Sequence, residues 1–466
     1  MRCCFRFLWF AFFTSSILCL TRATAQPSVA SDPPRLNLLV IMADDLGYGD
    51  LGCYGSSVHR TPHIDRLADE GMRFTDFYVT SSVCTPTRAA FLTGRLPRRC
   101  GSPGVLWPTS TEDALPNVEV TLAELLQDAG YATHLSGKWH LGHGKPEHLP
   151  QAHGFDHWYG MPYPNDMTAG HPQETRRREA WPPMPMMLDG EIVEQPINVN
   201  LLTQQYTADA VNFISKHHDR PFFLFLAHAM PHAIIGASPD FVSKSQNGLY
   251  GDSIEEIDWS TGEVMRALKA FGIDDTTLVL FTSDNGATHH VAHQPDEVQR
   301  WFCADMTSGS NAPLRGGKQA TFEGGVRVPG IFRLPGVIAP GKVESSPAII
   351  TDILPTMLDY LKIPLPAERV YDGRTIRPVL ESLGSRDETD FIFGGNEATG
   401  IRSGKWKLQL PKQPSWMLPK LESDQPLLFD LNVDIGESNN IAEQHPEIVK
   451  QLLRKMQTYE AETETR

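Results

Sequence analysis

Short, nearly continuous apolar runs alternate with segments of helical periodicity along the first two thirds of the chain. The apolar runs are Leu36 to Met42, Pro221 to Leu226 and Thr277 to Thr282, and Tyr131 to Leu135 is a further predicted strand. Helical patterns cover Thr61 to Leu67, Val120 to Gly130, Tyr206 to His217 and Ile254 to Phe271. Apolar runs of this length are typical of parallel strands buried on both faces. The alternation therefore predicts an α/β fold, in which helices flank a large, mostly parallel central sheet.

Two regions depart from this rhythm. Residues 161–200 show neither helix nor strand periodicity, which is typical of a functional loop or lid. From about Thr389 the chain has short strand-like pieces, notably Lys405 to Leu410, and a polar helix from Pro446 to Glu460. We therefore expect a catalytic domain at 26–388 and a smaller C-terminal α+β subdomain at 389–466.

The N-terminus has the features of a secretory signal peptide. Two arginines, Arg2 and Arg6, precede the apolar run from Phe7 to Phe13, and Ala23-Thr24-Ala25 suits a cleavage site. The run is well short of the roughly 18 residues that span a bilayer, although an uncleaved anchor remains the alternative. We expect residues 1–25 to be removed from an exported protein (periplasmic, extracellular or lysosome-like) that has no transmembrane segment.

Charge and cysteine content narrow the function classes. The 56 acidic and 41 basic residues give a net charge of -15, which argues against a nucleic-acid binder. An anionic substrate would need a local cationic pocket. Cys3, Cys4 and Cys19 fall in the signal peptide, and Cys53, Cys84, Cys100 and Cys303 remain. These four do not make a disulfide framework, and the sequence does not decide whether or how Cys53, Cys100 and Cys303 pair.

Polar side chains follow the predicted strands where each one ends. They are Asp44 with Asp45, Lys138 with His140, His232, and Asp284 with Asn285. Sites in α/β sheets form beyond the carboxyl ends of the strands, so these side chains are expected to converge. The oxygen ligands of Asp44, Asp45, Asp284 and Asn285 favour Ca²⁺ or Mg²⁺ over zinc. The alternative is that Asp-Asp and Asp-Asn-Gly are ordinary turn residues.

Cys84 is the centre of the stretch from Ser81 to Arg95, with Pro86 and Arg88 just after it. This pattern predicts a cysteine at a helix N-terminus, where the helix dipole and Arg88 favour an anion. A buried structural cysteine is the alternative.

Other candidate residues would complete an anion site. Lys138 and Lys318, the latter after Gly316-Gly317, are candidate cations for a tetrahedral anion, and His140 and His232 are candidate proton carriers. We prefer His232 to His228. We interpret His289, His290 and His293 as lining the substrate cleft rather than as a transition-metal site.

Several motifs carry a resemblance to a known family. They are C-T-P-T-R at Cys84 followed by L-T-G-R, A-D-D-L-G-Y-G-D-L-G-C-Y-G at Ala43, R-F-T-D-F-Y-V at Arg73, G-K-W-H-L-G at Gly137, S-D-N-G at Ser283 and E-G-G-V-R at Glu323. In this order they resemble the sulfatases, and most closely the arylsulfatase A-like and N-acetylgalactosamine-6-sulfatase-like members. The resemblance runs from Leu36 nearly to the C-terminus, and it implies an alkaline-phosphatase-like sandwich.

The resemblance also implies roles for individual residues. Cys84 would be oxidised to formylglycine by the formylglycine-generating enzyme, and an oxygen of the modified residue would join Asp44, Asp45, Asp284 and Asn285 around one Ca²⁺. Arg88 and Lys138 would hold the formylglycine hydrate and the sulfate, and His140 would be the partner of the hydrate. His232 and Lys318 would act on the leaving-group side. Two positions depart from the family pattern: Thr87 replaces a serine, and Pro164 replaces a serine that touches sulfate. That contact is either lost or made by Asn165 or Asp166.

The implied activity is hydrolysis of sulfate monoesters. One hydroxyl of the hydrate would attack sulfur and expel the alcohol, and the other would drive elimination of sulfate. A sulfated carbohydrate is the expected substrate, and residues 161–200 are expected to select it. Two alternatives remain open from the sequence: a phosphate or phosphonate ester hydrolase of the same fold, and a non-catalytic, calcium-dependent binder of sulfated glycan.

Overall fold

The structure, a computed structural model, describes Met1 and residues 36–102, 104–169, 181–288, 309–386, 390–411 and 423–463. The chain divides into two units, Met1–Pro34 and Arg35–Arg466, and the second contains the fold presented below. Cys303, the three histidines at 289, 290 and 293 and, apart from Met1, the expected signal peptide lie outside the described residues.

The four predicted strands form the centre of the main sheet. They are β1 (Asn37–Ala43), β4 (Ala132–Gly137), β8 (Phe222–Ala227) and β9 (Thr277–Ser283), and every residue in them is buried. Strand β1 lies between β8 and β9, β4 lies beyond β8, and all four are parallel. Burial on both faces accounts for the lack of polar alternation in β1, β8 and β9.

The complete main sheet has ten strands in the order β11-β2-β10-β9-β1-β8-β4-β5-β6-β7. The flanking strands are β2 (Met72–Phe74), β5 (His157–Gly160), β6 (Met186–Leu188), β7 (Glu191–Glu194), β10 (Gly330–Arg333) and β11 (Lys342–Glu344). Strand β10 is antiparallel to β2 and β9, and β6 is antiparallel to β5 and β7. A separate pair joins β3 (Phe77–Tyr78) to β12 (Ala348–Ile349). The predicted large, mostly parallel sheet is confirmed.

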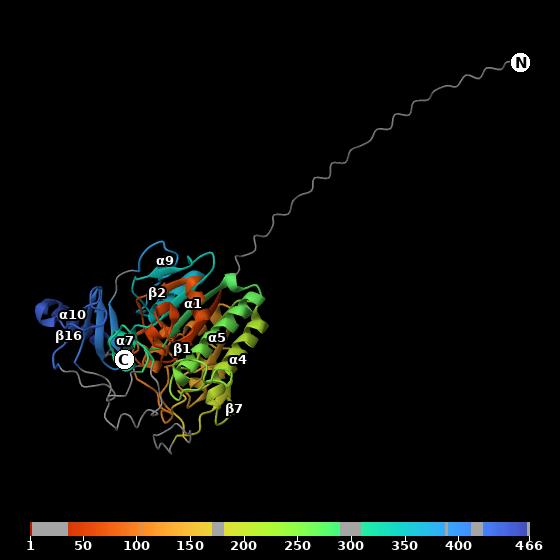
Figure 1. Cartoon of the computed structure of the whole chain (residues 1–466), viewed down its shortest axis with the longest axis horizontal. Helices are drawn as coiled ribbons and strands as arrows, with labels where there is room; N and C mark the ends of the chain where they lie inside the picture. The colour runs from red at the N-terminus through yellow and green to blue at the C-terminus, as the bar shows by residue number, and fades with distance from the viewer. Residues whose placement is uncertain are drawn as a thin grey trace. The chain divides into compact units, whose positions relative to one another are not determined.

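Helices cover both faces of this sheet (Figure 1). On one face, alternate β1 side chains from Leu38 to Met42 pack with α2 (Cys84–Thr93), α3 (Leu122–Asp128) and α8 (Ile353–Leu361). On the other face, the side chains between them pack with α1 (Pro62–Asp69), α4 (Leu202–His217) and α5 (Gly248–Ala270). The shorter helices are η1 (Tyr48–Asp50), η2 (Gly52–Tyr54), η3 (Pro146–His148), η4 (Pro150–His153), η5 (Val199–Leu201), η6 (Asp274–Thr276), α7 (Glu323–Val326), η8 (Ile350–Asp352), α9 (Arg377–Leu380) and η9 (Ala442–Gln444).

Residues 161–200 contain structure that their sequence pattern did not predict. Strands β6 and β7 form a hairpin joined by Asp189 and Gly190, whose φ angles are 51° and 93°. An Asp-Gly pair with positive φ is the signature of a two-residue hairpin turn. The strands have only three and four residues, and their register shifts between Met186 and Met187, so no period-two pattern develops. The R-F-T-D-F-Y-V motif at Arg73 spans the end of β2 and the whole of β3.

The C-terminal part forms a second, smaller sheet of antiparallel strands (Figure 1). Its strands are β13 (Phe391–Gly394), β14 (Ala398–Ser403), β15 (Trp406–Gln409) and β16 (Leu427–Asp430). Apolar side chains of β14 to β16 pack against α10 (Pro446–Thr463), notably Ile401 and Leu408 with Leu452 and Met456. Arg35–Arg466 nevertheless forms one compact unit, so the division at residue 389 stays a prediction.

A buried polar cluster joins this small sheet to the rest of the fold. Lys407 Nζ donates to Glu323 Oε1 at 2.8 Å, and the Glu323 backbone N–H donates to Glu437 Oε2 at 2.7 Å. Burial raises the pKa of Glu437 to about 8, whereas the charges of Lys407 and Arg327 overcome burial and lower the pKa of Glu323 to about 2. The cluster fixes α7, which begins just after the loop that contains Lys318.

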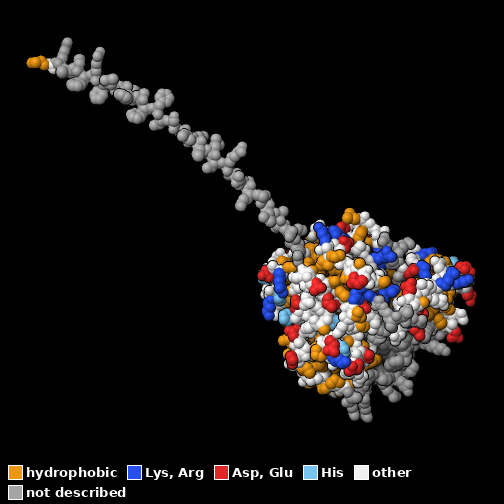
Figure 2. All heavy atoms as spheres, turned by 180° about the vertical axis from the view of Figure 1, so that it is seen from behind, with side chains coloured by type: hydrophobic (Ala, Val, Ile, Leu, Met, Phe, Trp, Pro, Cys, Tyr) orange, Lys and Arg blue, Asp and Glu red, His pale blue; other side chains and the backbone are white. Residues whose placement is uncertain are grey.

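Two further sequence expectations concern the cysteines and the membrane. Cys53, Cys84 and Cys100 are free thiols, so Cys53 and Cys100 are not paired with each other. Among the helices in the described part of the chain, none combines the length and apolarity needed to cross a membrane. On the face shown in Figure 2, acidic and basic side chains of the described residues are interspersed.

Candidate active site

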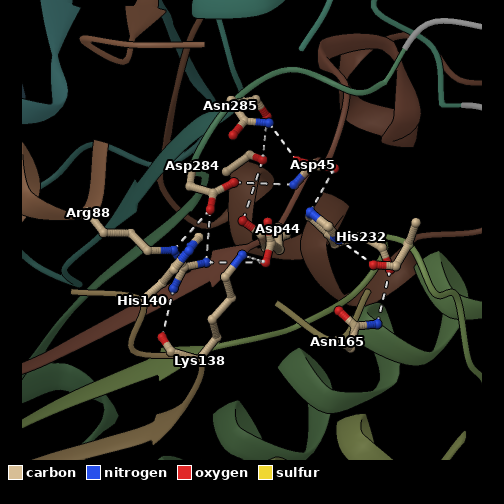
Figure 3. Close-up of polar contacts among 12 residues, drawn as sticks. Asp44, Asp45, Arg88, Lys138, His140, Asn165, His232, Asp284 and Asn285 are labelled. Atoms are coloured by element: carbon tan, nitrogen blue, oxygen red, sulfur yellow. Dashed lines mark hydrogen bonds and ion pairs between the residues drawn. The ribbon is translucent and has the colours of Figure 1, made fainter. Parts of the chain in front are cut away.

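The carboxyl ends of β1, β4 and β9 bring the predicted polar residues together (Figure 3). Asp44 and Asp45 follow β1, Asp284 and Asn285 follow β9, and Lys138 follows β4. Gly137, at the end of β4, has φ 121°, and a Cβ there would lie 1.9 Å from the carbonyl oxygen of Ala227. Only glycine fits where the two strands approach this closely. Lys138 follows Gly137 directly, and its side chain contacts Asp44.

Arg88 is the cation that ties these strand ends to helix α2. Its Nε and Nη2 lie 3.0 and 2.9 Å from Asp284 Oδ2, and its Nη1 donates to the carbonyl oxygen of Lys138 at 2.8 Å. Its Nη2 is also 3.6 Å from Asp44 Oδ2. The fully buried guanidinium therefore has a fixed orientation. Burial and the charge of Asp44 raise the pKa of Asp284, against the opposing effect of Arg88.

The pKa of Asp44 shifts in the opposite direction from that of Asp284. Lys138 Nζ donates to Asp44 Oδ2 in the interior of the protein. Burial opposes ionisation, but the charges of Lys138, His232 and Arg88 outweigh it, so the pKa of Asp44 is lowered. This carboxylate is therefore negatively charged inside the protein.

Asp45 is held by three other residues of the site. Asn285 Nδ2 donates to Asp45 Oδ1 at 2.6 Å, Lys318 Nζ donates to Asp45 Oδ2 at 2.7 Å, and His232 Nε2 lies 3.7 Å from the same oxygen. The backbone of Asp45 is left-handed, with φ 66°. Non-glycine residues in this conformation are uncommon and gather at functional sites, where surrounding contacts offset the strain.

The carboxylates meet the requirements of a cation site. One oxygen each from Asp44, Asp45 and Asp284 lie within 4.8 Å of one another, and so do one ligand atom each from Asp44, Cys84 and His232. Asp44 Oδ1 and Asn285 Oδ1 are buried and have no hydrogen-bond partner among the described residues. Buried acceptors without partners are costly, and these oxygen donors suit Ca²⁺ or Mg²⁺. The residues present therefore fit a divalent cation.

Cys84 is the first residue of α2, and its exposed fraction is 3%. The thiol therefore lies at the positive end of a helix dipole, with Arg88 one turn further on. Thr87 Oγ1 donates to the carbonyl oxygen of Ser81 at 3.0 Å, which holds the loop that leads into the helix. A serine hydroxyl at position 87 has the same donor, so the Thr87 departure leaves the local fold intact.

Comparisons with known proteins agree with this geometry. The Sulfatase family model matches residues 36–363. The chain is 39% identical to arylsulfatase A of Bos taurus over 95% of this chain and 90% of the relative. The chain belongs to the sulfatase family. It is an enzyme that hydrolyses sulfuric esters.

Other relatives of this sulfatase are N-acetylgalactosamine-6-sulfatase of Rattus norvegicus (39% identity, 82% of this chain, 72% of the relative) and steryl-sulfatase of Homo sapiens (37%, 79% and 73%). Among solved structures, the PsFucS1 sulfatase from Pseudoalteromonas sp. has a TM-score of 0.78 and 30% identity over 92% of this chain and 90% of that one. Ps i-CgsB in complex with a neocarrahexaose has a TM-score of 0.75 and 28% identity over 91% and 93%.

His140 is buried on the Lys138 side of the sulfatase site. Its backbone is left-handed, with φ 61°, and its Nε2 lies 2.9 Å from the carbonyl oxygen of Leu106. A carbonyl only accepts, so Nε2 carries the proton and Nδ1 presents a lone pair. Nδ1 has no hydrogen-bond partner among the described residues. Burial and the charge of Lys138 hold the pKa of His140 well below its usual value, so the ring is neutral.

His232 lies on the Asp45 side and has the opposite character. Its Nδ1 donates to the carbonyl oxygen of Ala233, and its Nε2 faces Asp45. Burial and Lys318 disfavour the charged ring, but Asp45 and Asp44 raise the pKa of His232 to about 9. His228 lies apart, with its Nε2 3.3 Å from Ser260 Oγ, and burial lowers its pKa to about 3.

Three contacts of the site were missed from the sequence or differ from expectation. Asn165, one of two candidates for the sulfate contact, donates from Nδ2 to the carbonyl oxygens of His232, at 3.4 Å, and Ile234. It therefore holds the His232 segment in place. Thr288 Oγ1 lies 3.4 Å from Asp45 Oδ2, and its only sequence signal is its closeness to Asn285. The backbone carbonyl of Leu106 has no side-chain signature at all.

Proposed function

We propose that this sulfatase cleaves sulfate monoesters with a formylglycine derived from Cys84 and one Ca²⁺ held by Asp44, Asp45, Asp284 and Asn285. The observation that carries the proposal is the pair of unpartnered buried oxygens, Asp44 Oδ1 and Asn285 Oδ1, in a site that also contains Cys84. Hydrated formylglycine supplies the attacking hydroxyl, with an oxygen that joins the calcium ligands, and the ion supplies positive charge.

The chain's own cations bind the sulfate group. Lys138 and Arg88 are buried and oriented by Asp44 and Asp284, and Lys318 lies on Asp45. Fixed donors of this kind stabilise negative charge that grows on the oxygens of a transferring group, without reorganisation during the reaction.

The two histidines divide the proton transfers. His232 Nε2 faces Asp45 Oδ2, and the charge of this carboxylate favours the protonated ring. His232 is therefore suited to give a proton to the departing alcohol oxygen, with Lys318 beside it. His140 is neutral and presents an unpartnered Nδ1 lone pair, so it is suited to accept a proton from the group at position 84. A sugar alcohol is a poor leaving group, which makes the acid on the His232 side necessary.

Modification of position 84 is tested by mass spectrometry of the peptide that contains Cys84, isolated from the native host. An aldehyde-bearing peptide supports the enzyme, and an unmodified thiol would favour the non-catalytic glycan binder. Cys84→Ala should abolish turnover and leave the melting temperature unchanged. Cys100→Ala, at a second buried free thiol, should keep turnover. Wild-type activity in Cys84→Ala would show that the nucleophile is misassigned. Co-expression with the formylglycine-generating enzyme should raise the aldehyde fraction.

We propose a sulfated carbohydrate as the substrate. Two similar proteins support this class: a relative named for N-acetylgalactosamine 6-sulfate cleavage and a solved structure that holds a neocarrahexaose. Desulfation rates on a panel of sulfated glycans test it, with a steryl sulfate included because steryl-sulfatase is also a relative. Sulfate and phosphate esters of one phenol, compared in the same assay, separate this activity from a phosphate or phosphonate ester hydrolase.

Export and domain division belong to the same proposal. Residues 26–388 would form the catalytic domain and residues 389–466 the small C-terminal subdomain. The mature protein would start after removal of residues 1–25. N-terminal sequencing of the protein from its host should therefore begin at Gln26, and a start at Met1 would contradict cleavage.

A further inference from the structure

Trp107 is an exposed aromatic side chain that the chemistry above does not use. Among the exposed large hydrophobic side chains of the described residues, only Trp107 and Phe271 are aromatic, with exposed fractions of 43% and 37%. An indole that is 43% exposed keeps apolar surface in contact with water, and tryptophan is favoured where an apolar face meets a polar ligand. The position of Trp107 decides whether this surface has a function.

The ring of Trp107 packs against a second indole. It stacks on Trp181, with 6.1 Å between ring centroids and 30° between planes. Trp181 is 7% exposed and belongs to the core cluster that contains Met161, Tyr163 and Met184. The two indoles come from segments far apart in the chain, so their stacking requires the tertiary fold. The supported ring is therefore a firm surface rather than a loose side chain.

The backbone beside Trp107 is bonded to the active site. The Leu106 carbonyl oxygen accepts from His140 Nε2 at 2.9 Å, and the Leu106 N–H donates to Thr85 Oγ1 at 3.4 Å. Thr85 follows Cys84 directly. On the other side, the Pro108 carbonyl oxygen accepts from His143 Nε2 at 3.1 Å. Both chain neighbours of Trp107 are thus bonded to the catalytic loops, which places Trp107 at the edge of the site.

The local turn also limits how the ring can move. The Trp107 N–H donates to Ser110 Oγ at 3.2 Å, and the Ser110 N–H donates to the Trp107 carbonyl oxygen at 2.8 Å. His143 in turn contacts the edge of Tyr163, with ring centroids 4.8 Å apart. These contacts fix the loop against the segments that follow β4 and β5.

We propose that Trp107, supported by Trp181, is a stacking platform for the pyranose ring that carries the sulfate ester. A pyranose has one face of C–H groups, which packs on an indole, and a rim of hydroxyls, which stays hydrated. The inference rests on the proposed carbohydrate substrate and adds a binding position for its ring. The platform holds the ring, whereas Arg88, Lys138 and Lys318 hold the sulfate.

The test compares Trp107→Ala, Trp107→Phe and the control Phe271→Ala. Phe271 stacks on His218 before the start of β9, at the opposite end of that strand from the site. A sulfated hexopyranoside is the substrate, and inorganic sulfate, which lacks a ring, is the competitive inhibitor. Trp107→Ala should raise KM about tenfold with kcat within about twofold, because a contact that is equal in ground and transition states acts on KM. Trp107→Phe should restore most of the loss, and Phe271→Ala should match wild type.

Inhibition by inorganic sulfate should be the same in all four proteins. An unchanged KM in Trp107→Ala would overturn the platform while leaving the proposed function intact. Parallel weakening of sulfate inhibition would also overturn it, since that result means that the variant disturbs the His140 loop. Wild-type hydrolysis of a steryl sulfate but of no sugar sulfate would overturn the proposed substrate and this subsite together.

Discussion

Arg88 Nε donates to Asp284 Oδ2 at 3.0 Å, although 196 residues separate the two in the chain. The same guanidinium donates to the carbonyl oxygen of Lys138 at 2.8 Å. One side chain therefore fixes the start of α2, the end of β9 and the end of β4 relative to one another. Because Cys84 begins α2, this contact also sets where position 84 lies relative to the carboxylates.

Arg88→Lys should lower kcat by about 100-fold or more, since a lysine ammonium cannot reach three partners in the guanidinium's fixed geometry. The melting temperature should fall only slightly, because the positive charge is kept. Steady-state kinetics and thermal melts measure both effects. Arg66→Lys, at an exposed ion pair with Glu70, is the matched control and should behave as wild type. A kcat within about threefold of wild type in Arg88→Lys would refute the assignment.

Removal of calcium should lower both activity and stability. A ligand that binds only the folded state stabilises it by about 2.7 kcal/mol at 100 times its Kd, so EDTA should lower the melting temperature and Ca²⁺ should restore it. Asn285→Ala removes a carbonyl ligand and should need a higher Ca²⁺ concentration for the same melting shift. Asn432→Ala, at an exposed asparagine, should respond as wild type. A melting temperature insensitive to EDTA would contradict the calcium site.

The strand ends of the site could be predicted because strands buried on both faces have an apolar sequence that is easy to recognise. Strands β1, β8 and β9 are mostly apolar, and Asp44, Lys138 and Asp284 stand out at the ends of β1, β4 and β9. Parallel pairing then brings those ends to one edge. The order β9-β1-β8-β4 itself was not predictable, since pairing depends on contacts between distant segments.

Short strands and backbone contacts could not be predicted, because they leave little or no pattern in the sequence. Strands β10 and β11 have four and three residues, too few to show periodicity, and they form by pairing with β9 and β2. The β6–β7 hairpin had a usable signal in Asp189-Gly190, but its strands are equally short. The Leu106 carbonyl acts through the backbone, which every residue shares, so no residue type reveals it.

A buried carboxylate outside the active site predicts a pH effect on stability. Asp258 Oδ1 accepts from the backbone N–H groups of His63 and Ile64 at 2.9 and 2.8 Å. Burial outweighs these two bonds and raises the pKa of Asp258 from 3.8 to about 7. Between these values the folded state binds more protons than the unfolded state, so the contribution of Asp258 to stability falls as pH rises from about 4 to 7.

Asp258→Asn keeps an oxygen acceptor and removes the titration. The variant should therefore match wild type near pH 4 and exceed its free energy of unfolding at pH 8 by on the order of 1–4 kcal/mol. Denaturant unfolding at the two pH values measures the difference. A difference between variant and wild type that stays constant with pH would show that Asp258 titrates as an ordinary carboxyl.

The buried polar cluster of Lys407, Glu323 and Glu437 predicts a large effect on stability outside the active site. Lys407→Met leaves Glu323 buried without its main cation, which typically costs about 3–5 kcal/mol. Lys405→Met, two residues away at an exposed pair with Asp430, should cost less than about 1 kcal/mol. Adding Glu323→Gln to Lys407→Met should recover part of the loss. Equal losses of stability in the two lysine variants would show that the buried cluster stabilises the fold no more than an exposed ion pair does.

The separation of Arg88 from Asp284 has a consequence during synthesis on the ribosome. The 196 residues between them take about 10–40 s to translate at ~5–20 residues per second. Until β9 emerges, the central sheet lacks a strand, and α2 has no acidic partner at that position. The sulfur of Cys84, 3% exposed once folding is finished, is therefore open to an external catalyst on the growing polypeptide for tens of seconds, and slower elongation would widen that window.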